Sequence, residues 1–227
     1  MIYNGNIELF FKVVDKIEKF QNYEIRNFET LLEQSTALIV SNHSFIAYDM
    51  LFLMNNYYKK TGKILRGVGD HLLFKIPIVK ELFLSLGVVD GNIKNINKLI
   101  EQNDKIIIYP GGAREAMKSS SEKYQLLWQG RYGFIKLAIK YNIPIIPIIS
   151  IGVEDIFHVY ANGYTLSFKN IPLPLFKISP KQKIIHYVQN PIFPEINSND
   201  EKIVMRRMQR KIKKVFKDTI NKEVKYG

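Results

Sequence analysis

The stretch that decides the fold is TALIVSNHSFIAYD, residues 36–49, in which an apolar run leads into a histidine. Thr36 to Val40 is short, uncharged and rich in β-branched residues, which is typical of a buried strand. His43 follows this run closely, and Asp49 lies further along. Histidine has an ordinary pKa near neutral pH, and a nearby carboxylate can fix its tautomer. The stretch therefore predicts a strand that ends at a general base with an orienting acid.

Whether His43 and Asp49 meet depends on where the next helix begins. On one continuous helix their positions would be about 9 Å apart along the axis, too far for a hydrogen bond. If Ser44 caps the helix instead, Asp49 points back toward His43. A lone acid in the apolar segment Phe45–Met54 also calls for a partner. We therefore expect contact between the two, although a purely structural pair at a strand–helix junction is a common alternative.

Short apolar runs alternate with longer segments of helical periodicity along most of the chain. We expect strands at Ala37–Val40, Ile64–Val68, Leu86–Val89, Lys105–Tyr109, Ile145–Ile151, Tyr164–Phe168 and Lys183–Val188. We expect helices at Phe45–Lys60, Ile76–Leu84, Ile93–Gln102, Glu122–Lys140 and Glu201–Lys222. This alternation predicts an α/β sandwich with a central mixed, largely parallel sheet flanked by helices. In such sheets, ligands bind beyond the carboxyl ends of the strands.

The two ends of the chain carry further helical patterns. Apolar residues recur at helical spacing between Phe10 and Phe20, which predicts an amphipathic helix within residues 1–27 that packs on the core or contacts a partner or membrane. Residues 200–227 read as a basic helix whose cations face an anionic surface. We expect its apolar residues to pack inward: Ile203, Met208, Ile212, Val215 and Ile220. With no repeat or linker, the sequence predicts one domain over residues 1–227.

Composition narrows the class of protein. The chain has 227 residues, 46% hydrophobic and 24% charged, as expected for a globular protein with one sizeable core. It has no cysteine, which excludes disulfides and cysteine-bound zinc and fits a reducing cytoplasm. The net charge of +12 has two interpretations. The lysines are simply solvated, or they attract an anionic partner such as lipid headgroups, nucleic acid or a phosphorylated substrate. No histidine pair has the spacing of a helical metal site, so we predict no metal.

Membrane contact, if present, is expected to be peripheral. The first residues lack the pattern of a signal peptide, and no apolar run reaches the roughly twenty residues of a spanning helix. We therefore predict a cytoplasmic, peripherally membrane-associated protein. The apolar segments 171–177 and 76–84 are candidates for insertion, although core burial explains the second equally well.

A second stretch, KIIIYPGGAREAM at residues 105–117, places a Pro-Gly-Gly turn after another buried strand. Gly111 and Gly112 would let backbone amides approach an anion, and Arg114 adds a planar cation suited to phosphate or carboxylate. The alternative is a tight turn with a surface pair between Arg114 and Glu115. Arg131, in a later helical segment, is expected at the surface rather than in the site. The other histidines, His71, His158 and His186, lie outside any recognisable block.

Three blocks resemble, in order and spacing, those of the glycerolipid (lysophospholipid) acyltransferase superfamily. They are Asn42-His43 with Asp49 downstream, Tyr-Pro-Gly-Gly-Ala-Arg-Glu at 109–115, and Ile-Pro-Ile-Ile-Pro at 143–147. The resemblance runs from about residue 28 to residue 156, and more loosely beyond. The commonest family pattern has one residue fewer between His and Asp, and its phosphate-site block, Phe-Pro-Glu-Gly-Thr-Arg-Ser, differs here at Gly111 and Glu115. Both departures resemble the mono- and diacylglycerol acyltransferase-related branch.

The resemblance implies a glycerol-phosphate acyltransferase-like fold and an O-acyltransferase of lipid metabolism, with phospholipid biosynthesis among its pathways. It implies that His43 takes the proton of the acceptor hydroxyl as that hydroxyl attacks an acyl thioester, while Asp49 orients and charges the imidazole. Coenzyme A or acyl carrier protein would carry the acyl group, and no cofactor, metal or covalent acyl-enzyme is required. Substrate is expected at Asn42, Tyr109, Gly111, Gly112, Arg114 and Glu115.

The acceptor stays open between a lysophospholipid and a neutral glycerolipid or alcohol. A carboxylate beside Arg114 would partly neutralise a phosphate site, which favours a neutral acceptor. A non-catalytic basic module for anionic membrane or nucleic acid would explain the charge but none of the blocks. A serine-type lipid hydrolase would need a glycine elbow, which Ser41 and Ser44 lack. We expect an acyl thioester, a lipid acceptor and an anionic membrane surface as partners, and no nucleic acid.

Overall fold

The structure is a computed structural model that describes residues 6–160, 165–168, 171–194 and 200–224. Within these residues, a seven-stranded sheet has the strand order β1-β11-β6-β2-β5-β3-β4. Its strands are β1 (Glu24–Arg26), β2 (Ala37–Ser41), β3 (Arg66–Gly69), β4 (Val88–Asp90), β5 (Lys105–Ile108), β6 (Ile145–Ile151) and β11 (Ile185–Val188). All neighbours are parallel except β11 and β6, so the predicted mixed, largely parallel sheet is confirmed.

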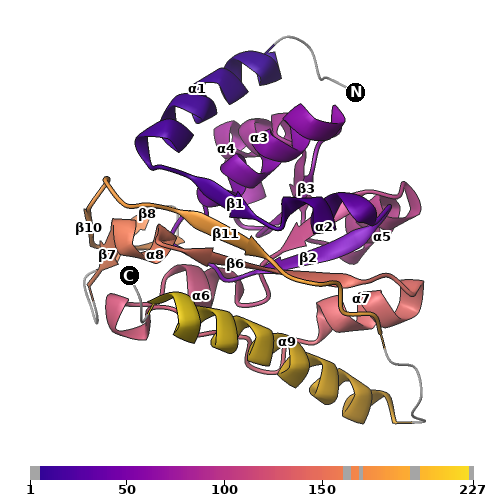
Figure 1. Cartoon of the computed structure of the whole chain (residues 1–227). Helices are drawn as coiled ribbons and strands as arrows, with labels where there is room; N and C mark the ends of the chain where they lie inside the picture. Colours follow the sequence, from indigo (N-terminus) through magenta and orange to yellow (C-terminus); the bar gives the residue numbers. More distant parts are fainter. Residues whose placement is uncertain (1–5, 161–164, 169–170, 195–199, 225–227) are drawn as a thin grey trace.

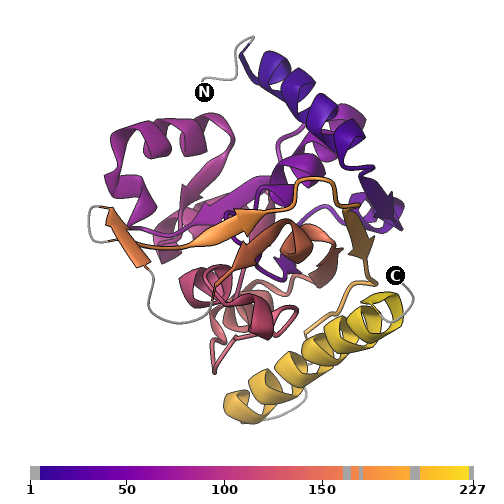
Figure 2. The ribbon, with the colours of Figure 1, turned by 90° about the vertical axis from the view of Figure 1, so that its left-hand side faces the viewer.

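Helices cover both faces of this sheet, as Figures 1 and 2 show from two sides. The helices are α1 (Asn6–Phe20), α2 (Phe28–Glu33), α3 (Asp49–Thr61), α4 (Pro77–Ser85), α5 (Ile93–Glu101), α6 (Gly112–Ala116), α7 (Gly133–Tyr141), α8 (Val153–Ile156) and α9 (Glu201–Val224). Short 3-10 turns are η1 (Leu73–Lys75) and η2 (Ser120–Glu122). Outside the main sheet, β7 (Phe157–Val159) pairs with β10 (Phe176–Ile178), and β8 (Thr165–Phe168) pairs with β9 (Ile171–Pro174).

The core has two halves, one on each face of the sheet, because side chains along a strand point alternately to either side. Ala37 and Ile39 of β2 pack with buried residues of α1 and α3. Leu38 and Val40 pack with buried residues of α5, α7 and α9. In Figure 1, α1 and α3 accordingly lie above the sheet, and α7 and α9 lie below it. β2 is therefore buried on both faces, as its sequence predicted.

Two of the predicted helices differ from the structure. The helix predicted over Phe45–Lys60 begins only at Asp49, because Ile46 and Ala47 have φ angles of 69° and 49°. A right-handed helix cannot contain such residues, so Ser44 does not cap α3. The helix predicted over Glu122–Lys140 is instead a 3-10 turn that ends at Glu122 and a helix that begins at Gly133. Between them the backbone is left-handed at Tyr124 and Gln129.

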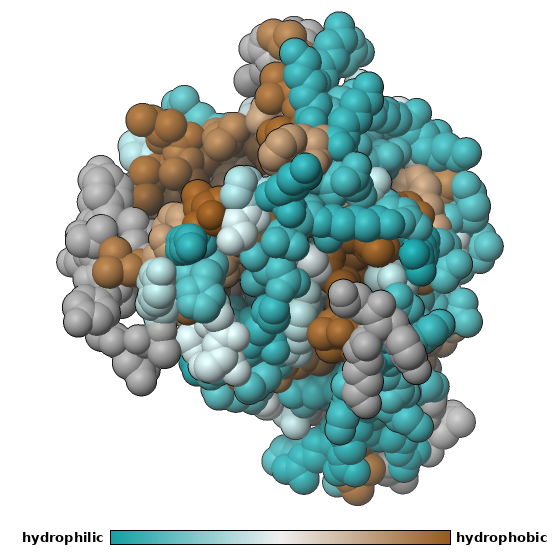
Figure 3. Space-filling view, turned by 60° about the vertical axis from the view of Figure 1, so that its left-hand side comes forward, coloured by the Kyte–Doolittle hydropathy of each residue, from teal (hydrophilic) through white to brown (hydrophobic). Residues whose placement is uncertain are grey.

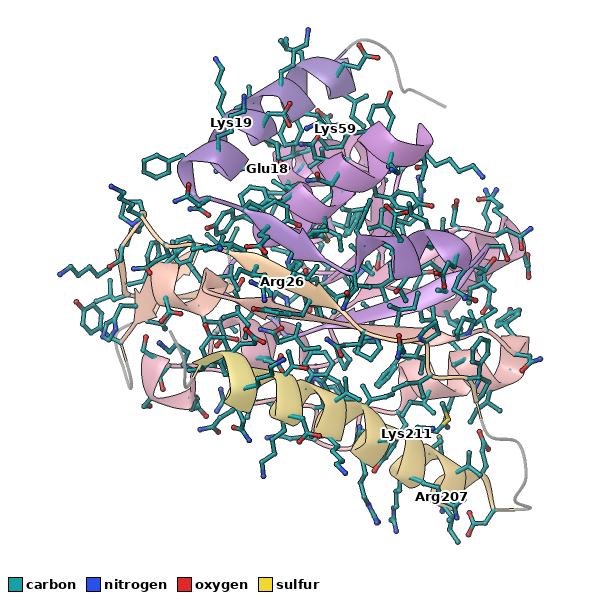
Figure 4. All side chains as sticks on the ribbon, viewed as in Figure 1. Glu18, Lys19, Arg26, Lys59, Arg207 and Lys211 are labelled. Carbon is teal, nitrogen blue, oxygen red and sulfur yellow. The ribbon has the colours of Figure 1, made fainter. Side chains whose placement is uncertain are left out.

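The N-terminal segment is tied to α3 by buried polar contacts. The Asn55 side chain of α3 donates to the carboxylates of Asp15, at 2.6 Å, and Glu18, at 2.8 Å. Lys59 also pairs with Asp15, and Figure 4 shows Glu18 and Lys59 near the boundary of the two helices. After α1 the chain forms β1, which pairs with β11 at the edge of the sheet. The apolar spacing predicted the helix, but nothing in the sequence predicted β1.

The C-terminal helix α9 lies along the opposite face and matches its pattern only in part. Met208 and Ile212 are buried, as expected, whereas Ile203 is exposed. Most of its cationic side chains, Arg207 and Lys211 among them, are exposed (Figure 4), whereas Lys213 is half-buried. Among the described residues, no helix has both the length and the apolar character needed to cross a membrane.

Candidate active site

The two sequence blocks meet at the carboxyl ends of β2 and β5. Val40 is paired with Ile108 in the sheet, so the segments that leave the two strands start side by side. The ring of His43 packs on the ring of Tyr109, with centroids 4.4 Å apart. A pocket opens beside His43, lined by residues of α6, of the segment that follows it, and of α8 and β7. The structure thus brings His43 and the Pro-Gly-Gly turn together, as the sequence predicted.

The hydrogen bonds of His43 set its tautomer. Nδ1 lies 2.7 Å from the backbone carbonyl oxygen of Ser44. A carbonyl oxygen only accepts hydrogen bonds, so Nδ1 carries the proton and Nε2 presents a lone pair. Burial lowers the pKa of His43 to about 4, and the positive charge of Lys118 adds to this, while the Ser44 carbonyl and Asp49 oppose it. At neutral pH the imidazole is therefore uncharged and able to accept a proton.

Asp49 does not contact His43 in the way the sequence predicted. Its Oδ1 accepts a hydrogen bond from the Ser44 hydroxyl at 3.3 Å, and its Oδ2 lies 3.0 Å from Nε2 of His186. The expected direct pair is wrong because the left-handed turn after His43 places Ser44 between the two side chains. Burial acts to raise the pKa of Asp49, but the hydrogen bond and charge of His186 outweigh it, and the pKa is lowered. Asp49 is therefore ionised.

His186 is the site residue that sequence reasoning missed. It lies on β11, where it is buried, and its Nδ1 is 2.7 Å from the hydroxyl of Tyr23. Tyr23 directly precedes β1, so the pairing of β1 with β11 creates this contact. One signal was available: within the predicted strand Lys183–Val188, His186 interrupts a run of hydrophobic residues from Ile184 to Val188. A polar side chain inside a buried strand needs a buried partner.

Glu115 holds the Pro-Gly-Gly turn against His43. Its Oε1 accepts the backbone N–H of His43 and its Oε2 that of Leu127, each at 2.8 Å. Burial raises the pKa of this carboxyl group, although Lys118 and the two backbone N–H groups oppose the shift. A side chain at Gly111 would place its Cβ 2.3 Å from the Glu115 Cβ, so only glycine fits there. Glu115 therefore binds backbone N–H groups. The alternative of a surface pair between Arg114 and Glu115 is wrong.

The turn is closed from its other side by Arg131. Its Nη1 donates to the carbonyl oxygens of Pro110, at 3.2 Å, and Gly111, at 2.8 Å. Gly112 has a φ angle of 51°, in the left-handed region that favours glycine. Although Arg131 is exposed, it fixes carbonyl groups of the turn beside His43, which the sequence did not predict.

Three other cations near the site, Arg114, Lys118 and Lys123, have carboxylate partners. The guanidinium of Arg114 forms two contacts with Glu122, at 2.6 and 3.2 Å, and Arg114 does not line the pocket beside His43. Two lysines do line it: buried Lys118 lies 2.9 Å from Glu154, and Lys123 pairs with Asp155. The expected anion site at Arg114 is thus neutralised, by Glu122 rather than by Glu115.

Asn42 connects β2 to β6. Its amide nitrogen donates to the Ser150 carbonyl, at 3.0 Å, and to Glu154, at 3.1 Å, while its oxygen accepts the Ser150 N–H at 2.8 Å. The side chain is buried. These contacts fix the strand end that carries His43 and leave substrate binding by Asn42 without geometric support.

Comparison with known proteins gives one family. Residues 40–181 match the family model described as diacylglycerol acyltransferase. The bovine protein named "DGAT1/2-independent enzyme synthesizing storage lipids" is 31% identical over 61% of this chain and 41% of its own. Diacylglycerol O-acyltransferase 1 of Saccharomyces cerevisiae is 39% identical over 43% of this chain and 25% of its own. Phytyl ester synthase 2 of Arabidopsis thaliana is 27% identical over 66% of this chain and 22% of its own.

This chain thus spans less than half the length of these relatives. A solved structure shares the fold over nearly the whole chain. It is the 1-acyl-sn-glycerophosphate acyltransferase PlsC of Thermotoga maritima, with a TM-score of 0.59 and 16% identity. The alignment covers 96% of this chain and 84% of that one. The predicted acyltransferase-like fold is therefore confirmed.

Proposed function

The chain belongs to the diacylglycerol acyltransferase family, and we propose that it transfers a fatty acyl group from an acyl thioester to the hydroxyl of a lipid. The observation that carries this proposal is His43, whose Nδ1–H is held by the Ser44 carbonyl and whose Nε2 is free to accept a proton. A base of this kind typically contributes about 10² to 10⁴ in rate.

In the proposed reaction, Nε2 of His43 takes the hydroxyl proton while the hydroxyl oxygen attacks the thioester carbonyl carbon. The carbon–sulfur bond then breaks, and the thiol of coenzyme A or acyl carrier protein leaves with the proton from His43. The ionised carboxylate of Asp49 favours the imidazolium that His43 forms between these two proton transfers. The base and the thioester suffice, so no further cofactor enters the proposal.

We propose a neutral acceptor, such as a monoacylglycerol, a diacylglycerol or a long-chain alcohol. The pairing of Arg114, Lys118 and Lys123 with carboxylates supports this choice. A lysophosphatidate headgroup would have to displace a carboxylate to pair with any of these three cations, at a cost in desolvation. The names of the relatives, which refer to storage lipids, diacylglycerol and phytyl esters, agree with a neutral acceptor.

Thiol release from an acyl-coenzyme A, measured with a panel of acceptors, tests the proposal. We expect release, with formation of the matching ester, for neutral acceptors and much slower release for lysophosphatidate. The variant Asp155→Asn, which removes the carboxylate partner of Lys123 in the pocket, should raise relative turnover of lysophosphatidate. Turnover of lysophosphatidate alone would overturn the neutral acceptor. Labelling by a fluorophosphonate would point to a serine hydrolase, and salt-sensitive nucleic-acid binding without turnover to a basic module.

We also propose peripheral membrane association, through the outer face of α1. One face of this helix, with Phe11 and Val14, is buried, yet Leu9, Val13, Ile17 and Phe20 are 40–64% exposed. These four follow helical spacing, and Lys12, Lys16 and Lys19 lie among them. Ile78 of α4 is 80% exposed, and Figure 3 shows hydrophobic side chains gathered on one face. In the predicted insertion segment 171–177, the side chains of 171–174 lie outside the described residues, whereas Leu175 and Phe176 are exposed.

Flotation with vesicles of phosphatidylglycerol and of phosphatidylcholine tests the membrane proposal. Val13→Glu should weaken binding to both kinds of vesicle. Lys214→Gln, an exposed control on α9, should weaken binding only to the anionic phosphatidylglycerol vesicles, and by less than Val13→Glu does. Unchanged flotation of the Val13→Glu protein would contradict a role for α1.

A further inference from the structure

We propose that His186 and Tyr23 are positioning residues for His43, acting through Asp49 and Ser44; this inference rests on the proposed function. The three groups behind Ser44 come from distant parts of the chain. Asp49 begins α3, His186 lies on β11 and Tyr23 precedes β1. His186 falls outside the residues that match the family model. None of the sequence blocks around His43 contains it.

A continuous series of hydrogen bonds links Tyr23 to the base. The Tyr23 hydroxyl lies 2.7 Å from Nδ1 of His186, and Nε2 of His186 lies 3.0 Å from Asp49. Asp49 accepts the Ser44 hydroxyl at 3.3 Å, and the Ser44 carbonyl accepts Nδ1–H of His43 at 2.7 Å. A carboxylate only accepts, so Nε2 of His186 carries a proton and donates to Asp49, while Nδ1 of that ring faces the Tyr23 hydroxyl, which can donate or accept.

The series determines whether Asp49 can stay charged. The side chains of Asp49 and His186 are 2% and 3% exposed. A carboxylate buried this deeply without a donor would take up a proton. Ser44 and His186 both contact the Asp49 carboxylate, and His186 acts most strongly to lower its pKa. Burial raises the pKa of Tyr23, so the phenol keeps its proton. Loss of His186 would therefore weaken the hydrogen bond between Asp49 and the Ser44 hydroxyl. It would also reduce the negative charge on Asp49, which favours protonated His43.

Other titratable groups surround this series and stay in place in every variant below. Those that act on Tyr23, Asp49 or His43 are Glu18, Tyr48, Tyr109 and Lys118. Because they are unchanged, a shift in pH dependence between wild type and a His186 variant reports on His186 itself.

Three variants of the full chain test the proposal by acceptor-dependent thiol release. His186→Phe keeps the ring but removes both nitrogens, and should lower kcat about 10- to 100-fold with little change in KM. It should also move the acid limb of the kcat profile to higher pH, because the pKa of Asp49 rises. His186→Gln, which can still donate to Asp49, should recover most of kcat. Tyr23→Phe should reduce kcat only about threefold, since the bond to Asp49 remains.

Nitrogen NMR of the histidine rings gives a readout that does not depend on activity. The chain has four histidines, so the exposed His71 and His158 can be replaced by glutamine to assign the signals. In the wild type, His43 should carry its proton on Nδ1 and His186 on Nε2. In His186→Phe, the His43 signals should move toward a mixture of tautomers, whereas His186→Gln should keep the wild-type assignment. The wild-type assignment and the His186→Gln comparison can be made even if His186→Phe fails to fold.

The outcomes separate the inference from the proposed function. If the wild type shows no acceptor-dependent release, the proposed function fails. If the wild type is active and His43→Ala is not, but folded His186→Phe keeps wild-type kcat and acid limb, then His186 is only structural and the inference is overturned. A His43 proton on Nε2 in the wild type would overturn it as well.

Discussion

Two buried carboxylates lie near His43, and they differ in the groups that bind them. Asp49 and Glu115 follow the ends of neighbouring strands and are 1% and 0% exposed. Asp49 is bound by a histidine ring, and its pKa is lowered. Glu115 is bound by two backbone N–H groups, and its pKa is raised because burial dominates. Two equally buried carboxylates therefore have different roles: Asp49 provides negative charge near His43, and Glu115 fixes the position of the His43 backbone.

Of the substitutions that test this comparison, Asp49→Asn should have the largest effect on kcat. The amide oxygen can still accept from His186, so the fold should survive, but the negative charge near His43 is lost. We expect kcat to fall about 100-fold, within the range that general-base catalysis supplies, with the melting temperature within a few degrees of wild type. Steady-state kinetics and thermal unfolding check this. An unfolded protein, or unchanged kcat, would show that Asp49 does not act through its charge.

Glu115→Gln should affect stability instead. One oxygen becomes an NH₂ group that faces a backbone donor, either that of His43 or that of Leu127. A buried N–H left without an acceptor costs about 1–3 kcal/mol, so the free energy of unfolding should fall by that amount. Denaturant unfolding measures it. If this variant keeps its stability and loses kcat as Asp49→Asn does, the two carboxylates do not divide their roles as described.

The pH dependence of kcat/KM tests the environment of His43. Because its pKa is about 4, the base form is present well below the ordinary value of 6.5, so kcat/KM should fall only near pH 4. Between pH 6.5 and pH 4 the unfolded chain binds the proton that the folded one does not, so stability should fall as the pH drops through this window. An acid limb near pH 6.5 would contradict the burial of His43.

Arg114→Gln should have the smallest effect. Arg114 pairs with Glu122 at the surface and lies outside the pocket beside His43. Exposed pairs of this kind contribute about 0–1 kcal/mol. Turnover of a neutral acceptor should therefore stay within about threefold of wild type. A loss of a hundredfold would restore Arg114 to the substrate-binding role that its position in the sequence predicted.

The sequence predicted those parts of the molecule that depend on local pattern. Strand β6 was placed at its observed limits, and the blocks at His43 and Gly111 were expected at one edge of the sheet. It could not predict contacts made by folding. The left-handed backbone at Ile46 moves Asp49 away from His43, and the β1–β11 pairing brings His186 to Asp49. Arg114 was expected in the site because it follows the Gly111-Gly112 turn; its observed partner, Glu122, lies in a segment whose 3-10 turn the sequence did not predict.

The central claim, that His43 is the base of acyl transfer, is tested most directly by acceptor-dependent thiol release from acyl-coenzyme A in wild type and His43→Ala. His43→Gln, which keeps a polar side chain, serves as the matched control, and thermal unfolding confirms that both variants fold. We predict that release falls about 10² to 10⁴-fold in both variants. Release at the wild-type rate from folded His43→Ala would contradict the account.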